Sequence, residues 1–151
     1  MNPLISVVIP CYNDGAYLPE TIAKLALQTE KSFEIIIVND GSTEGNTLQV
    51  LAQLATQENI TVLHKENGRM SSARNHGVKY AKGKYIAALD ADDYFDPSFF
   101  KKAIAILNSQ PTTAVVTSYI QYFGNKTGTS KPRGGNAYNF LFSNQCPACA
   151  M

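Results

Sequence analysis

Three carboxylates end an apolar run in the second half of the chain. The segment "YIAALDADDYFDP" (Tyr85–Pro97) contains Asp90, Asp92 and Asp93 directly after its apolar residues. Carboxylates this close raise one another's pKa unless a cation or hydrogen-bond donors stabilise their charge. Asp90 and Asp92 project to the same side of an extended segment. Because hard carboxylate oxygens suit Mg²⁺ or Mn²⁺ together with ligand phosphates, the pattern indicates either a metal site or a solvated turn.

Five continuous, β-rich apolar runs are predicted to form the strands that position these carboxylates. They are Leu4–Ile9, Glu34–Val38, Ile60–Leu63, Tyr85–Leu89 and Ala114–Ile120. Apolar runs without polar alternation are typical of strands covered on both faces, as in a parallel sheet.

Apolar residues at helical spacing lie between the predicted strands. They are Leu18, Ile22 and Leu25, then Leu48, Leu51, Ala52 and Ala55, and finally Phe100, Ala103, Ile104 and Leu107. A further helix is predicted to start at Ser71 or Ser72, and Pro97 suits a first helical turn. The alternation predicts an α/β fold with a mostly parallel sheet and right-handed crossovers. After Ile120, residues 123–136 are rich in Gly, Lys and Pro and predict a loop or loose hairpin.

The composition predicts one globular domain over residues 1–151 and narrows the class of partner. With 44% hydrophobic residues, a chain of 151 residues can bury a core. A formal net charge of +1 gives no reason to expect nucleic acid or an anionic membrane surface as partner. The apolar runs are far shorter than the roughly 20 residues of a membrane span. Because the N-terminus also lacks a basic leader and a small-residue cleavage site, we expect a cytoplasmic chain without a membrane span.

The chain contains three cysteines, an odd number that argues against a disulfide framework. Cys146 and Cys149 have the C-x-x-C spacing of a redox pair or of half a zinc site. A zinc site normally shows a second ligand pair, whereas the two histidines, His64 and His76, are separated. We interpret both cysteines as small buried apolar residues.

Polar residues follow each of the first four predicted strands. The segments are "PCYND", "NDGST", "HKENGRMSSARN" and "DADD". Because ligands of open α/β sheets bind beyond the carboxyl ends of the strands, these segments are predicted to line one crevice. In such a crevice Tyr12 can stack on a ring, Asp40 can accept hydrogen bonds from a base or ribose, and Arg74 can pair with phosphate. These residues also have structural interpretations: Tyr12 could cover the core, and Arg74 could form a surface ion pair. Two further cations of these segments, Lys65 and Arg69, are interpreted as solvated.

Together, these motifs resemble family 2 glycosyltransferases of the GT-A fold. The resemblance is carried, in order, by "SVVIPCYNDGAYLPETIAKLALQT", "FEIIIVNDGSTEGN" and "KENGRMSSARNHGVKYAKGKYIAALDADDYFDP", and it covers about residues 4–120. It implies an inverting transfer of a sugar from a nucleotide-diphosphate sugar to an acceptor hydroxyl, with Mn²⁺ or Mg²⁺ as cofactor. A UDP-sugar donor is favoured as the commonest in the family, and a glycan or glycolipid acceptor in polysaccharide biosynthesis is expected.

The resemblance also implies a role for individual residues at each strand exit. The implied nucleoside loop consists of Pro10, Cys11, Tyr12 and Asn13. The other implied donor contacts are Asp40 with the base, Asn67 and Gly68 with the donor, Arg74 with the nucleotide and Asp90 with the ribose. In the D-x-D motif the implied metal ligand is Asp92, with Asp93 as the second candidate.

An inverting transfer needs a general base to take the acceptor's proton. In the family this base is a carboxylate that lies downstream of the donor-binding part, so we expect it beyond residue 151. Residues 1–120 are then the donor-binding part and residues 121–151 an incomplete acceptor side of a truncated chain. The isolated chain is expected to turn over poorly.

Other enzyme classes fit the motifs less well. Aspartyl-nucleophile phosphatases place D-x-D on the first strand, whereas here it follows the fourth predicted strand and continues into Asp93 and Tyr94. The glycine-rich motif of a Rossmann dehydrogenase is absent after the first strand, where "PCYNDG" stands, and the G-K-[ST] of a P-loop is absent as well. The remaining alternative is a non-catalytic module that binds a nucleotide sugar or a glycan. Only the missing general base separates such a module from a glycosyltransferase.

Overall fold

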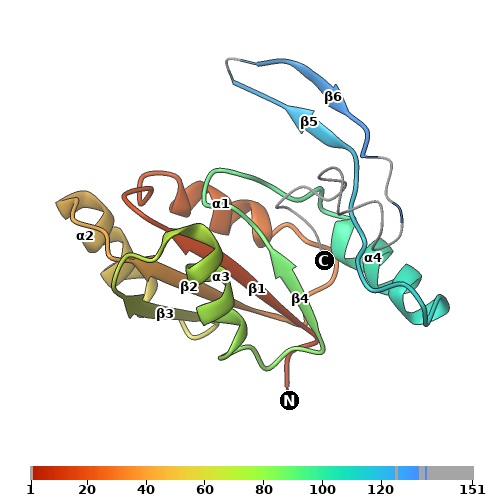
Figure 1. Cartoon of the computed structure of the whole chain (residues 1–151), viewed down its shortest axis with the longest axis horizontal. Coiled ribbons are helices and arrows are strands. Elements are labelled where there is room, and N and C mark those ends of the chain that lie inside the picture. Colours follow the sequence, from red (N-terminus) through yellow and green to blue (C-terminus); the bar gives the residue numbers. More distant parts are fainter. Residues whose placement is uncertain (1, 125, 133–134, 136–151) are drawn as a thin grey trace.

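The computed structural model describes residues 2–124, 126–132 and 135, and a parallel sheet lies at its centre (Figure 1). The four strands are β1 (Ile5–Cys11), β2 (Phe33–Asp40), β3 (Ile60–Lys65) and β4 (Tyr85–Ala88). Their order in the sheet is β3-β2-β1-β4, and all neighbours run parallel. The first four predicted strands and the α/β class are therefore confirmed.

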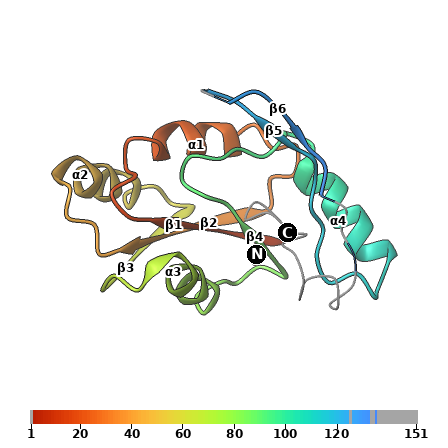
Figure 2. The same cartoon turned by 45° about the horizontal axis from the view of Figure 1, so that its top comes forward.

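Four helices cover the two faces of the sheet. They are α1 (Leu18–Leu25), α2 (Gly45–Leu54), α3 (Arg69–Val78) and α4 (Phe99–Ser109). Figure 2 shows α3 on one face and α1 on the other. Val8, Ile36 and Val38 form a core cluster with Ala73 of α3, whereas a larger cluster on the opposite face joins α1, α2 and α4. Because successive side chains of β1 and β2 are buried on opposite faces, these strands carry unbroken apolar runs.

The start of two helices differs from the sequence prediction. Helix α3 begins at Arg69 with Gly68 as its N-cap, so the predicted start at Ser71 or Ser72 is wrong. Helix α4 begins at Phe99, and Pro97 lies before it. The carbonyl of Pro97 instead accepts a hydrogen bond from the backbone N–H of Thr29 at 2.8 Å.

The buried face of α2 is rotated from the predicted one. Leu51 is buried as expected, but Leu48 is 42% exposed, and the other buried residues are Thr47 and Leu54. The hydroxyl of Thr47 accepts a hydrogen bond from the N–H of Gly15 at 3.0 Å and donates to Glu44 at 2.9 Å. These polar bonds turn Thr47 inward, so an apolar pattern alone could not give the orientation of the helix.

The fifth predicted strand does not join the sheet. Within Ala114–Ile120, Val116 is buried but Val115 and Tyr119 are 51% and 66% exposed, so the run is not covered on both faces. The chain instead forms a separate antiparallel hairpin from β5 (Ile120–Tyr122) and β6 (Gly128–Ser130), in line with the predicted loop or hairpin. Cys146 and Cys149 lie outside the described residues.

The helices of the described residues are all too short or too polar to cross a bilayer.

Helix α3 packs closely on the sheet at Gly77. A Cβ atom at this position would lie 2.6 Å from Val8 Cγ1 and 3.0 Å from Val38 Cγ2. We predict that Gly77→Ala lowers the free energy of unfolding by about 1–2 kcal/mol, because the overpacking exceeds the gain in helix propensity. Urea denaturation followed by circular dichroism measures the change.

Gly45 of α2 is the matched control, because an added Cβ would meet no atom within 4 Å. Gly45→Ala should leave stability unchanged or raise it slightly. Equal effects of the two substitutions would contradict the close packing of α3.

Candidate functional site

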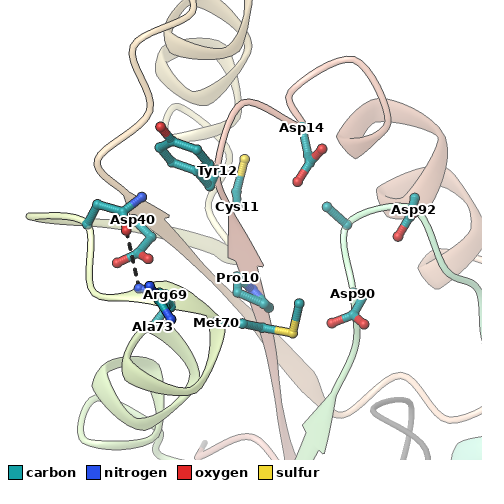
Figure 3. Close-up of a pocket in the computed structure, with 12 residues that line it drawn as sticks. Pro10, Cys11, Tyr12, Asp14, Asp40, Arg69, Met70, Ala73, Asp90 and Asp92 are labelled. Carbon is teal, nitrogen blue, oxygen red and sulfur yellow. Dashed lines mark hydrogen bonds between the residues drawn. The ribbon is translucent and has the colours of Figure 1, made fainter.

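A cavity of about 600 Å³ opens where the carboxyl ends of β1, β2 and β4 meet (Figure 3). The parallel sheet brings together polar segments that lie far apart in the sequence. Seven sequence-predicted residues line it: Pro10, Cys11, Tyr12, Asp40, Asn67, Asp90 and Asp92. Four others are not part of the lining: Asn13, Gly68, Arg74 and Asp93. Four further lining residues were not singled out from the sequence: Asp14, Met70, Ala73 and Ala91. The fifth, Arg69, was interpreted as solvated; it is exposed and also lines the cavity.

The exit of β1 forms one wall and is fixed by Asn13. This residue has a positive φ of 60°, and its side-chain oxygen accepts the backbone N–H groups of Thr43 and Glu44 at 2.9 and 3.0 Å. Its own N–H donates to Ser42 Oγ at 3.1 Å. Asn13 therefore ties the β1 exit to the β2 exit, which holds the neighbouring Tyr12 ring, 47% exposed, at the cavity.

Cys11 lies at the base of the same wall and is 1% exposed. Burial raises the pKa of its thiol, and the negative charge of Asp14 raises it further. The thiol is therefore protonated at neutral pH and lines the cavity as a small, weakly polar group.

The carboxylate of Asp40 joins the exits of β2 and β3. Lys65 Nζ donates to its Oδ1 at 2.5 Å, and the N–H of Gly68 donates to its two oxygens at 3.0 and 3.2 Å. Burial alone would raise the pKa of Asp40, but the hydrogen bonds from Lys65 and Gly68 and the charge of Lys65 bring it below the ordinary value. Lys65 is thus a half-buried ion-pair partner, with 17% of its side chain exposed, and its interpretation as solvated is wrong.

The turn after Asp40 requires glycine. Gly41 has a φ of 77°, and a Cβ there would lie 2.8 Å from the backbone nitrogen of Asn67. This close approach brings the segment before α3 against the end of β2, where Asn67 lines the cavity.

Arg74 lies one turn into α3 and forms an ion pair with Asp90. The two side chains are 23% and 24% exposed, and the Nε of Arg74 is buried without a hydrogen-bond partner. Arg74 is not part of the cavity lining. The structure therefore places it where it orients Asp90 and neutralises that carboxylate.

Asp14 is a cavity carboxylate that sequence reasoning did not single out. In Figure 3 it lies across from Asp92, near the entrance to α1. Its pKa is raised, first by burial and then by the negative charges of Asp92, Glu44 and Asp90. The signal was present in the sequence, because Asp14 belongs to the polar segment that directly follows the first strand.

The acidic side of the cavity suits a cation that shares its ligands with a bound phosphate. Asp92 is exposed and lines the cavity, whereas Asp93 is half-buried and its N–H donates to the Asp90 carbonyl at 3.2 Å. Among the described residues, no group of three His, Cys, Asp or Glu side chains is arranged to hold a metal by itself. Mg²⁺ is usually bound by one or two carboxylates plus substrate phosphates, so Asp92 with Asp14 nearby fits that chemistry.

The parallel sheet and the strand-exit cavity define a GT-A-type nucleotide-sugar transferase fold. TarS from Staphylococcus aureus, solved with UDP and with UDP-GlcNAc, superposes with a TM-score of 0.71 at 29% identity. The match covers 85% of this chain and 38% or 37% of those chains. The mannosyltransferase PcManGT from Pyrobaculum calidifontis was solved in complex with GDP-Man and Mn²⁺. It superposes with a TM-score of 0.70, and the match covers 81% of this chain and 36% of PcManGT. At 22% identity, this likeness supports the fold alone.

The sequence matches the profile of glycosyl transferase family 2 over residues 6–147, so the chain belongs to this family. Glycosyltransferase GlyG of Streptococcus pneumoniae is 37% identical over 124 residues, which are 81% of this chain and 41% of GlyG. Chondroitin synthase of Pasteurella multocida is 37% identical over 115 residues, 76% of this chain and 12% of that enzyme. The chain thus spans less than half the length of these relatives.

The lowered pKa of Asp40 predicts a pH-dependent contribution to stability. We expect Asp40→Asn to lower the free energy of unfolding by about 2–3 kcal/mol at neutral pH, because a buried, hydrogen-bonded charge is removed. A carboxylate whose pKa is lower in the folded than in the unfolded state stabilises the fold at pH values above the unfolded pKa. This stabilisation is lost as the pH falls through the folded pKa. The deficit of the variant should therefore shrink once the pH falls below 3.8, the ordinary pKa of Asp.

Urea unfolding of the variant and the wild type across this pH range measures the deficit. Glu58→Gln serves as the control, because Glu58 is exposed at the opposite end of β3. A deficit of Asp40→Asn that stays constant with pH would contradict the stabilised carboxylate.

Proposed function

We propose that this chain forms the donor-binding part of an inverting glycosyltransferase that uses a nucleoside diphosphate sugar. The observation that carries the proposal is the single cavity that collects Tyr12, Asp40, Asp90 and Asp92 from three strand exits. Family membership and relatives such as GlyG support sugar transfer as the reaction class. The UDP and UDP-GlcNAc complexes of TarS, at 29% identity, support a uridine nucleotide as the first donor to test.

The nucleoside is proposed to bind at the wall formed by β1 and β2. The exposed ring of Tyr12 offers a face for stacking on the base. Asp40 is ionised and each of its oxygens has two lone pairs, so it can accept a further hydrogen bond from a base N–H. Asp90, which forms an ion pair with Arg74, is proposed to accept hydrogen bonds from the ribose hydroxyls.

The diphosphate is proposed to bind between the acidic side of the cavity and the wall opposite it. Asp92 is the proposed ligand of Mn²⁺ or Mg²⁺, with Asp93 as the second candidate. When bound, the cation would neutralise charge on the leaving diphosphate. Asp92 offers the cation a hard carboxylate oxygen at the cavity surface, and the nearby Asp14 adds negative charge.

Transfer is proposed to occur by displacement at the anomeric carbon. The bond from that carbon to the diphosphate breaks as the acceptor oxygen bonds to the opposite face, and a general base takes the acceptor's proton. The described residues supply the donor side of this reaction. A glycan or glycolipid acceptor in polysaccharide synthesis is proposed, supported by the similarity to chondroitin synthase.

Thermal unfolding with a nucleotide panel tests the proposal. The panel contains UDP, GDP, CMP and dTDP, each with and without Mn²⁺. A ligand at about 100 times its dissociation constant adds roughly 2.7 kcal/mol of stability, which corresponds to a rise in Tm of about 5–10 °C for a chain of this size. We expect one diphosphate to produce such a rise and Mn²⁺ to enlarge it.

Asp92→Asn should remove the metal-dependent part of the shift, whereas the distant Glu58→Gln should preserve all of it. No shift with any nucleotide in a folded sample would overturn the proposed donor site. A shift that Asp92→Asn leaves intact would place the metal elsewhere.

A further inference from the structure

We propose that Arg69 is an affinity-determining residue of the donor site and binds the phosphates of the nucleoside diphosphate. This inference rests on the proposed function and reassigns the phosphate contact that the sequence suggested for Arg74. It follows from the backbone of Arg69, from the partners of the nearby cations and from the charges that line the cavity.

The backbone of Arg69 has a conformation that favours glycine. Its φ is 69°, and Asn13 is the other non-glycine residue with a positive φ in the described part of the chain. In this conformation the N–H of Arg69 donates to Asn67 Oδ1 at 3.3 Å and also contributes to the low pKa of Asp40. Glycine would provide the same backbone bonds without the clash of a Cβ atom. The local fold therefore does not need the arginine side chain, and its conformational cost is consistent with a role in binding.

The guanidinium of Arg69 is available to a ligand, unlike the other cations around the cavity. Lys65 is paired with Asp40, and Arg74 is paired with Asp90. Within the described residues, no carboxylate lies within ion-pair distance of Arg69, which is exposed. Figure 3 shows Arg69 beside Asp40 at the wall opposite Asp92. It is the cationic residue of the described cavity lining.

The charge of the lining explains why a free guanidinium is needed. Asp14, Asp40, Asp90 and Asp92 all contribute carboxylates to the lining, and a diphosphate adds further negative charge. A cation bound at Asp92 would compensate this charge on one side of the cavity. Arg69 compensates it on the other, and its planar donors match two phosphate oxygens at once.

The test compares UDP with uridine, which lacks the phosphates, in wild type and Arg69→Gly. Dissociation constants are measured by NMR titration in the presence of Mg²⁺, and Tm is measured without nucleotide. We expect Arg69→Gly to weaken UDP binding by about tenfold or more and uridine binding by less than about twofold. The Tm should stay unchanged or rise, because glycine relieves the positive φ. GDP and guanosine replace this pair if the wild type prefers GDP.

Two further variants sharpen the comparison. Arg69→Lys keeps the charge without the planar fork and should lose less UDP affinity than Arg69→Gly. Lys101→Ala removes an exposed cation from α4, away from the cavity, and should leave the affinity for UDP unchanged.

Three results would overturn the assignment of Arg69 while leaving the proposed function intact. They are an unchanged affinity for UDP, an equal loss for UDP and uridine, and a loss of binding accompanied by a lower Tm. Failure of the wild type to bind either diphosphate would overturn both proposals.

Discussion

Burial of the Asp40 carboxylate against Lys65 and the amide of Gly68 determines where α3 begins. The carboxylate is 2% exposed, so its charge must be compensated inside the protein. The two groups that compensate it come from the end of β3 and from the N-cap of α3. Once the helix starts there, its close packing at Gly77 fixes its direction, and Arg74 meets Asp90. The cavity is thus a consequence of one buried charge and the parallel sheet.

The ion pairs divide the cavity into two sides of different character. Asp40 and Asp90 each have a cationic partner, whereas Asp14 and Asp92 have no ion pair among the described residues. The raised pKa of Asp14 arises from burial and then from Asp92, so negative charge is concentrated on that side. This asymmetry supports a cation at Asp92, and it leaves Arg69 as the group that can attract an anion from the opposite wall.

The sheet and most of the cavity could be predicted from the sequence, because buried parallel strands produce unbroken apolar runs and their exits must meet at one edge. The run Ala114–Ile120 has the same composition, but nothing in the sequence shows that it lacks a covering layer. Motif matching identified Asn13 and Arg74 but not their partners, since their contacts join segments distant in the sequence. Arg69 was interpreted only as a solvated cation, because a positive φ at an arginine has no sequence signature.

Amide chemical shifts of a ¹⁵N-labelled chain titrated with UDP and Mg²⁺ would locate the nucleotide most directly. If the strand exits form the donor site, the largest shifts should fall in residues 11–14, 67–70 and 90–92, which line or border the cavity. The β5–β6 hairpin should shift little. The opposite result would be shifts concentrated around the second cavity, of about 480 Å³, between β4 and residues 113–115, or no shifts at all. Either outcome would contradict a nucleotide site at the carboxyl ends of the strands.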